Sequence, residues 1–227
     1  MSETGPFWER SEQVEFFAGR EPDCRLMEII KEFKKPAATR ILDLGCAGGR
    51  NAVFLAEKGF DVWAVDASRA MVKKTRERLS AVLDPQAAGR RVLLERMDNL
   101  KAFPSGTFHL VVALGIYHNA MNREQWDGSI RETARVLIPD GRVLVANFTP
   151  RTDLTGKGHR PVPGEPHLYE DFEVGRLTLL EADELDEEMG RFGFYPVVPS
   201  ETVVKKTEEG QRVTVNALYQ LSGQRES

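Results

Sequence analysis

Residues 41–66 read Ile-Leu-Asp-Leu-Gly-Cys-Ala-Gly-Gly-Arg-Asn-Ala-Val-Phe-Leu-Ala-Glu-Lys-Gly-Phe-Asp-Val-Trp-Ala-Val-Asp, and this stretch decides the fold. An apolar run, a glycine-rich turn, a helical segment and a second apolar run that ends on a carboxylate follow one another, an order typical of a βαβ unit. In such folds ligands bind outside the carboxyl ends of the strands. The stretch therefore predicts a nucleotide-type binding site at one edge of a parallel sheet.

The spacing of small residues in the turn indicates which ligand this site takes. A dinucleotide-binding turn needs small residues at its first, third and sixth positions, but counting from Gly45 the sixth position is Arg50. The small residues fall instead at Gly45, Ala47 and Gly49, and Asp43 stands just before them. A carboxylate there would repel a pyrophosphate, whereas it suits a ligand that carries an amino group and a positive charge. S-adenosylmethionine is such a ligand.

Helical and strand patterns alternate along the rest of the chain. Apolar spacing, turns and breakers predict helices over residues 24–33, 49–58, 68–83, 123–137 and 179–192, and strands over 40–44, 61–65, 91–97, 108–114, 142–148, 197–206 and 211–221, with a tight turn at Pro139-Asp140-Gly141. Residues 197–221 predict an antiparallel hairpin. A run of βα units followed by a hairpin predicts an α/β fold with a doubly wound sheet and an antiparallel edge.

Two segments lie outside this regular pattern. Residues 1–36 are interpreted as an N-terminal helical cap, and residues 37–227 as one domain with a proline- and glycine-rich insertion at 149–176 that could act as a lid. We expect substrate selectivity to come from these segments, although packing explains the aromatic residues equally well. The candidates are Phe7, Trp8, Phe16, Phe17, His159, Arg160, His167, Tyr169 and Phe172.

The bulk composition excludes several classes of protein. The net charge of −4 over 227 residues argues against nucleic acid as a partner, because phosphate binding needs a concentrated basic face. Cys24 and Cys46 form neither a metal-spaced pair nor a disulfide framework. No apolar leader or membrane-length run is present, so a cytoplasmic protein without membrane contact is expected. A monomer and a homodimer are both compatible with the sequence.

From about residue 24 to residue 221, the order of elements and the turn motif resemble a class I S-adenosylmethionine-dependent methyltransferase. The stretch from Gly49 to Val62 looks particularly like small-molecule members of the tellurite-resistance and thiol-methyltransferase group. The resemblance implies a Rossmann-like sheet of seven strands with a C-terminal antiparallel hairpin. It also implies S-adenosylmethionine as cofactor and a small-molecule methyl acceptor.

The same resemblance implies positions for the cofactor. The turn would surround the methionine half, Asp66 would accept hydrogen bonds from the ribose hydroxyls, and the segment after residue 97 would read the adenine. The predicted cofactor-binding residues are Asp43, Gly45, Cys46, Ala47, Gly49, Asn51, Asp66, Ala67, Met71, Asp98, Asn99, Ala113 and Leu114. Core packing for Met71, a helix N-terminus for Asp66 and loop polarity for Asp98 remain alternatives.

Tyr117 and His118 follow the strand whose end faces the reactive methyl group in this family. His118 is a candidate general base, since its ordinary pKa lies near neutrality, and a buried structural histidine is the alternative. A hydroxyl acceptor would need such a base, whereas a thiolate would not. Sequence spacing gives no support to a metal site built from His118, His159 and His167.

Other functions remain open at this stage. Methylation of a protein or an RNA is one, although the acidic balance speaks against RNA. A non-catalytic regulatory protein that binds S-adenosylmethionine is another. An NAD-dependent reductase is disfavoured by Arg50 at the sixth position of the turn.

Overall fold

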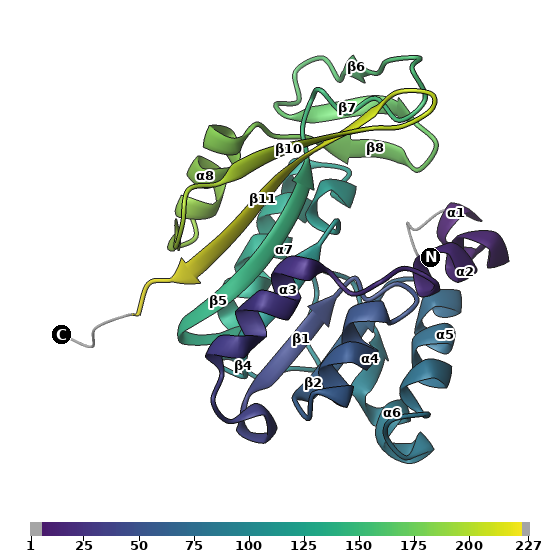
Figure 1. The fold of residues 1–227 in the computed structure, drawn as a ribbon. Coiled ribbons are helices and arrows are strands. Elements are labelled where there is room, and N and C mark those ends of the chain that lie inside the picture. The colour runs from purple at the N-terminus through teal and green to yellow at the C-terminus, as the bar shows by residue number, and fades with distance from the viewer. Residues whose placement is uncertain (1–5, 224–227) are drawn as a thin grey trace.

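A twisted central sheet organises the chain, of which this computed structural model describes residues 6–223 (Figure 1). Its strands lie in the order β3-β2-β1-β4-β5-β11-β10, and a short β9 pairs with β11. The strands are β1 Arg40–Leu44, β2 Asp61–Asp66, β3 Val92–Leu94, β4 Phe108–Leu114, β5 Leu137–Phe148, β9 Phe194–Pro196, β10 Glu201–Lys206 and β11 Gln211–Leu221. Strands β1 to β5 pair in parallel and β11 is antiparallel to β5 and β10. The doubly wound sheet with an antiparallel hairpin is confirmed.

The predicted tight turn at residues 139–141 is wrong. β5 starts at Leu137 and continues through Pro139, Asp140 and Gly141, and the β4–β5 register shifts between Phe108 and Leu110. Asp140 has a positive φ of 61°. The turn residues therefore form an irregularity within a strand, because the ladder to β4 resumes on both sides of them.

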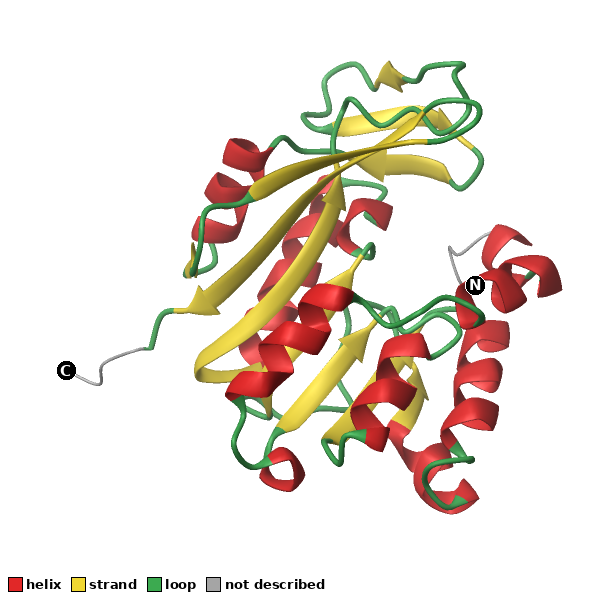
Figure 2. Cartoon of the chain, in the orientation of Figure 1, coloured by secondary structure: helices red, strands yellow, loops and turns green. Residues whose placement is uncertain are grey.

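Helices cover both faces of the sheet (Figure 2). They are α1 Pro6–Glu9, α2 Ser11–Ala18, α3 Cys24–Ile29, α4 Arg50–Glu57, α5 Arg69–Leu79, α6 Pro85–Arg91, α7 Arg123–Val136 and α8 Ala182–Gly190, with single 3₁₀ turns at Ile30–Glu32, Pro36–Ala38 and Tyr117–Asn119. The sequence prediction missed α6. Its Pro85 occupies the first turn and Asp84 caps it by accepting from the amide of Ala87, so the proline that was expected only to end α5 also begins the next helix. None of the described helices is long and apolar enough to cross a membrane.

Two apolar clusters fill the two faces of the sheet. Ile41 belongs to the cluster under α3, α4, α5 and α6, whereas its neighbour Leu42 belongs to the cluster under α7 and α8. This division follows from the alternation of side chains along a strand. Asp43 comes next and shares the face of Ile41, so its carboxylate points toward the helix that the glycine-rich turn starts.

The insertion folds into a small sheet of its own beyond the carboxyl end of β5 (Figure 1). It contains β6 Arg160–Pro161, β7 Leu168–Phe172 and β8 Gly175–Thr178, paired antiparallel. The hydroxyl of Thr152 donates to the carbonyl of Val213 on β11 at 2.6 Å. The insertion is thus an ordered layer anchored on the central sheet.

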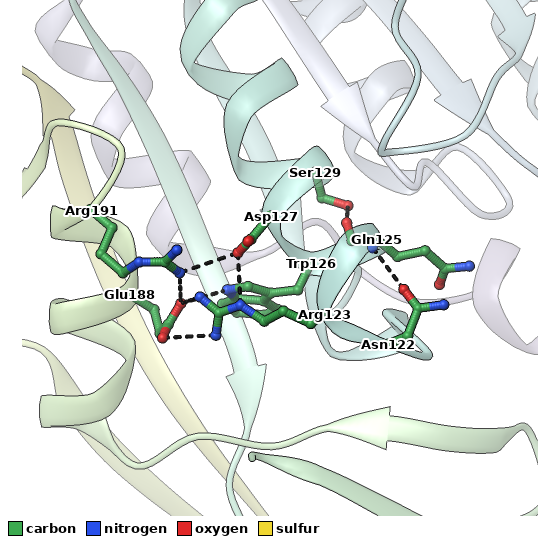
Figure 3. A network of polar contacts seen from close by, with 8 residues as sticks. All are labelled: Asn122, Arg123, Gln125, Trp126, Asp127, Ser129, Glu188 and Arg191. Atoms are coloured by element: carbon green, nitrogen blue, oxygen red, sulfur yellow. Dashed lines mark hydrogen bonds and ion pairs between the residues drawn. The ribbon is translucent and has the colours of Figure 1, made fainter. Parts of the chain in front are cut away.

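A polar network joins α7 to α8 below this layer (Figure 3). Glu188, with 12% of its side chain exposed, accepts hydrogen bonds from Arg123, from the indole of Trp126 and from Arg191. Asp127 completes the network by pairing with both arginines. One carboxylate therefore satisfies donors from two helices, and the tryptophan it orients is 1% exposed.

We predict that Glu188→Ala lowers the free energy of unfolding by about 1–3 kcal/mol, because it leaves the buried indole without its acceptor and the two guanidinium groups with Asp127 alone. Urea denaturation would measure the change. Glu187→Ala, on the exposed side of the same helix, is the control and should stay within about 0.5 kcal/mol of the parent. Equal effects of the two substitutions would contradict the proposed role of the network.

Candidate cofactor-binding and active site

The glycine-rich turn between β1 and α4 is held in an unusual backbone conformation. Gly45, Ala47 and Gly49 all have positive φ values, of 72°, 47° and 81°. Two hydrogen bonds hold Ala47 in this conformation. Its amide donates to Asp66 Oδ2 at 2.9 Å, and its carbonyl accepts from the Thr75 hydroxyl at 2.7 Å. An alanine thus adopts a conformation that favours glycine because tertiary contacts fix it.

The glycines of the turn are also required by packing. A Cβ atom added to Gly45 would lie 2.6 Å from Ile116, and one added to Gly48 would lie 2.6 Å from backbone and side-chain atoms of Ala18. Gly48 was not among the predicted site residues, because the need for it comes from α2, which is distant in sequence. The turn therefore supports the N-terminal helices as well as any ligand.

Asp43 is the buried charge at the base of the turn. It is 2% exposed, and its Oδ2 has no hydrogen-bond partner among the described residues. Burial raises the pKa of Asp43 to about 7, against the lowering effect of the nearby Arg50 charge and of the Ala52 amide, while the charge of Asp66 adds to the rise. An unpaired buried oxygen of this kind costs free energy unless a ligand donor reaches it.

Asp66 ends β2 beside the turn. Its Oδ1 accepts from the amide of Ser68 at 2.9 Å and its Oδ2 from the amide of Ala47. Burial raises the pKa of Asp66 to about 6, although these amides lower it and the charge of Glu9 raises it further. Each carboxylate oxygen keeps a lone pair beyond these bonds, so the group can still accept hydrogen bonds from a diol.

Several predicted cofactor residues also support the scaffold, and their contact with a cofactor stays a prediction. Met71 and Ala113 are 1% and 0% exposed and belong to the packed interior, whereas Leu114 and Ala67 are partly exposed. Cys46 lies buried with its Sγ 3.6 Å from the Thr75 hydroxyl. The side chain of Asn51 accepts from the amide of Asp23 at 3.1 Å, so it ties α4 to the start of α3.

Asp98 and Asn99 both contact Arg96 in a tight turn after β3. Both carboxylate oxygens of Asp98 accept from the Arg96 guanidinium at 2.9 Å. The amide of Asn99 donates to the Arg96 carbonyl at 3.0 Å. A tight turn of residues 96–99 thus uses the Asn99 amide, whereas each Asp98 oxygen keeps a lone pair, and the contact of both residues with a cofactor stays a prediction.

Tyr117 and His118 occupy different environments. Tyr117 is fully buried among core residues and its hydroxyl lies 2.7 Å from the Thr133 hydroxyl, so the structure does not place it at the strand edge. His118 is 6% exposed, stacks on Phe148 with ring centroids 4.1 Å apart, and has a buried Nδ1 without a partner among the described residues. Burial, and then the charge of Arg212, lower the pKa of His118 to about 3. A general base works best with a pKa near the working pH, so this environment favours a neutral, hydrogen-bonding imidazole.

The N-terminal helices dock on the site through contacts that the sequence did not reveal. The carboxylate of Glu9 accepts from the first free amides of α5, those of Arg69 and Ala70, at 3.0 and 3.1 Å. Glu15 pairs with Lys74 one turn further along the same helix. These bonds place a short amphipathic cap beside the carboxyl ends of β1 and β2.

One ion pair links the cap to the insertion. Arg10 Nη1 lies 2.5 Å from Glu173 Oε1, in the turn between β7 and β8. The two segments that were expected to select the substrate therefore meet across the sheet edge, although the pair itself is exposed and weak.

His118, His159 and His167 have different contacts. His159 packs on Tyr169 and Phe172, and His167 lies 3.7 Å from Glu184. Within residues 6–223 no group of three or more His, Cys, Asp or Glu side chains could hold a metal ion.

Residues 41–141 match the family model described as a methyltransferase domain. These residues contain the turn, both buried carboxylates and the end of β4. This part of the chain is similar to methyltransferase domains, and the similarity supports S-adenosylmethionine as the cofactor. The groups described above fit that cofactor, because the free oxygen of Asp43 can accept from an ammonium group and Asp66 from ribose hydroxyls.

Curated relatives match at low identity. A ubiquinone biosynthesis O-methyltransferase of Xanthomonas axonopodis pv. citri is 28% identical over 153 residues, which cover 64% of this chain and 61% of that protein. The 27-O-demethylrifamycin SV methyltransferase of Amycolatopsis mediterranei is 32% identical over 115 residues, 49% of this chain and 39% of that one. The chain thus spans about three fifths or less of the length of these relatives. None of these names supports the narrower likeness to tellurite-resistance and thiol methyltransferases, which stays a prediction.

Solved structures share the fold across nearly the whole chain. The 1,6-didemethyltoxoflavin-N1-methyltransferase of Burkholderia thailandensis, solved with its substrate and S-adenosylhomocysteine, has a TM-score of 0.63 at 20% identity and covers 95% of this chain and 80% of that one. The [4+2]-cyclase SpnF has a TM-score of 0.69 at 15% identity, with 98% and 97% covered. The fold is therefore common to proteins described as methyltransferases and as a cyclase.

We predict that Asp43→Asn flattens the pH dependence of stability in the ligand-free protein. The pKa of Asp43 is raised on folding, so between about pH 4 and pH 7 the folded state holds a proton that the unfolded state has lost, and stability falls as pH rises through that window. Between pH 5 and pH 8 the substitution should recover about 2 kcal/mol relative to the parent. Denaturation at both pH values measures this.

The exposed Asp183→Asn is the matched control and should leave the pH dependence unchanged. An unchanged profile in Asp43→Asn would show that Asp43 ionises normally.

Proposed function

We propose that this protein transfers the methyl group of S-adenosylmethionine to a small-molecule acceptor. The observation that carries the proposal is the buried Asp43 with its unpaired Oδ2, placed behind a turn whose backbone is bonded to Asp66. A dinucleotide would bring phosphate charge toward these carboxylates. A ligand with an ammonium group and a ribose instead meets acceptors at both positions.

In this proposal the cofactor extends from the turn toward the end of β2. Asp43 accepts from the amino group, and Asp66 accepts from the ribose hydroxyls while it keeps the turn in place. The ammonium group would also lower the pKa of Asp43 on binding, because an opposite charge favours the carboxylate. The energy lost by burying Asp43 in the free protein is thereby regained in the complex.

When bound, S-adenosylmethionine supplies a sulfonium whose methyl carbon is already electrophilic. A nucleophilic atom of the acceptor forms a bond to that carbon as the bond to sulfur breaks, sulfur keeps the electron pair, and an acceptor proton is released. The residues of this chain contribute alignment and exclusion of water. The N-terminal cap, residues 1–36, and the insertion at 149–176 serve this purpose in the proposal, joined by Arg10 and Glu173.

His118 takes part as a neutral group in this proposal. A pKa lowered to about 3 makes its imidazole a weak base, whereas its unpartnered Nδ1 can form a hydrogen bond with the acceptor. Acceptors that lose a proton easily, such as thiols or acidic phenols, suit this site better than alcohols.

A second candidate is a protein that binds the cofactor without transferring its methyl group. The similarity to a structure described as a [4+2]-cyclase favours keeping this candidate, since that protein shares the fold over 98% of this chain. The two candidates share the cofactor site and differ in turnover.

Thermal-shift measurements with S-adenosylmethionine, S-adenosylhomocysteine and NAD separate the ligand classes. We expect both sulfur compounds to raise the melting temperature, because each binds the folded state only. Stabilisation by NAD alone would overturn the proposed cofactor. Transfer of a labelled methyl group to small-molecule extracts then separates an enzyme from a non-catalytic binder.

We predict that Asp66→Ala weakens S-adenosylhomocysteine binding at least tenfold by calorimetry, since it removes the ribose acceptors and loosens the Ala47 amide. Asp98→Ala should weaken binding less than Asp66→Ala does, because it removes a single acceptor for the adenine amino group and leaves the turn after β1 intact. The opposite order of effects would move the ribose contact away from Asp66.

We further predict that the affinity for S-adenosylmethionine rises about tenfold from pH 5.5 to pH 8 in the parent protein. The ammonium group needs an ionised Asp43, whose pKa in the free protein is raised to about 7. Calorimetry in Asp43→Asn should show weaker binding with little pH dependence. A pH-dependent affinity that persists in this variant would assign the effect to another group, with Asp66 the next candidate.

A further inference from the structure

Register places Arg212 beside the aromatic pair at the end of β5. Thr214 of β11 stands opposite Phe148, the last residue of β5. Because alternate residues of a strand share a face, Arg212 lies on the same side of the sheet as Phe148, one diagonal position further out. Arg212 is partly buried there.

The other member of the aromatic pair is His118. Its ring is parallel to that of Phe148 within 4°, and its buried Nδ1 has no partner among the described residues. Arg212 is close enough for its charge to lower the pKa of His118. The unpartnered Nδ1 of His118 and the guanidinium group of Arg212 thus lie near the stacked rings of His118 and Phe148.

Arg20 lies in the segment between α2 and α3, with its guanidinium 5.8 Å from the centroid of the Phe16 ring, and it feels the charge of Arg212. Burial and then the charge of Arg212 lower the pKa of Arg20, while Asp23 raises it. No carboxylate in the described part of the chain forms an ion pair with Arg20 or Arg212. By contrast, the neighbouring Arg25 is bonded to both oxygens of Asp23.

The result is a local excess of positive charge in an acidic protein. Arg50 adds to it, since the charge of Arg20 lowers the pKa of Arg50. Asp23 and Asp43 are the carboxylates whose charges act on the pKa of Arg50, and Asp23 is already paired with Arg25. The whole chain has a net charge of −4. Partly buried arginines without a carboxylate partner are stabilised most by an anion that reaches both of them.

We propose that Arg212 and Arg20 bind the anionic group, a carboxylate, of an aromatic methyl acceptor whose ring lies against His118 and Phe148. This inference rests on the proposed function and names the class of its substrate. Arg212 would fix the carboxylate through paired hydrogen bonds, and His118 Nδ1 would meet a polar substituent of the ring. Neutral aromatic compounds of the same shape would bind poorly, since they leave both guanidinium groups unpaired.

The carboxylate of the cofactor is a second possible partner for these arginines. Burial lowers the pKa of Arg50, and the charge of Asp43 opposes that effect, so Arg50, which follows the turn directly, lies near Asp43 and the proposed methionine half. Arg212 is on β11, separated from β1 by β4 and β5. The position of Arg212 therefore assigns it to the acceptor, and a test must separate the two carboxylates.

The test uses the full chain saturated with S-adenosylhomocysteine and two matched pairs of probes, salicylate with salicylamide and phenylacetate with phenylacetamide. Calorimetry should show that at least one carboxylate binds tenfold or more tightly than its amide. Arg212→Gln should abolish this preference and leave the affinity for S-adenosylhomocysteine within twofold of the parent. Arg20→Gln should reduce the preference at least threefold.

Arg90→Gln is the matched control, because it removes one exposed arginine far from the sheet edge. The His118 ring signals in NMR spectra should shift on addition of the carboxylate and not of the amide. Equal binding of carboxylate and amide, or no binding of either, would overturn the inference. So would an Arg212→Gln variant that loses S-adenosylhomocysteine tenfold, because the arginine would then belong to the cofactor. Failure of S-adenosylhomocysteine to bind the parent protein would instead reject the proposed function.

Discussion

The bond from the Ala47 amide to Asp66 is the constraint on which the rest of the site depends. It joins the turn after β1 to the end of β2, and it holds an alanine at a φ of 47°. With the turn fixed, α4 starts at Arg50 and the carboxylate of Asp43 is enclosed beneath it. With Asp66 fixed, α5 begins at Arg69 and presents the amides that Glu9 caps. A single peptide group thus sets the positions of two helices and two acidic side chains.

This arrangement lowers the stability of the ligand-free fold and favours the binding of a cationic ligand. Asp43 is buried and Asp66 half-buried, close enough for the charge of Asp66 to add to the rise that burial causes in the pKa of Asp43, and one oxygen of Asp43 has no partner among the described residues. A fold selected for stability alone would place apolar groups there, since buried charges without full compensation cost free energy. A cationic ligand reverses the sign of that cost. The strain at Ala47 fits the same account, because functional turns keep backbone conformations that their surroundings must enforce.

Charge of the opposite sign gathers a few strands away. Arg212 lies on β11, whereas Asp43 and Asp66 lie on β1 and β2, on the other side of β4 and β5. In the proposed complex the ammonium group of the cofactor meets the carboxylates, and the anionic group of the acceptor meets Arg212. The two ligands would then approach each other near His118, which follows β4.

The sequence predicted the βα order, the strand ends and the buried acid before the turn, because hydrophobic periodicity and glycine spacing are local properties. It did not predict the start of β5 at Leu137, where the ladder to β4 overrides the turn residues of Pro139-Asp140-Gly141. It did not predict that Arg96 pairs with Asp98 and accepts from the Asn99 amide. Side-chain pairing between residues two apart leaves no periodic signal, so no pattern in the sequence could show it.

By itself, the sequence determined a doubly wound α/β domain with an acid-flanked glycine turn, since these depend on which residues are apolar, small or charged along the chain. Only the tertiary structure decided that Tyr117 belongs to the core, that His118 is buried beside Arg212, and that Glu9 caps α5. Those outcomes depend on which distant segments meet. Burial and neighbouring charge set the chemistry of a titratable group, and both are properties of the packed chain.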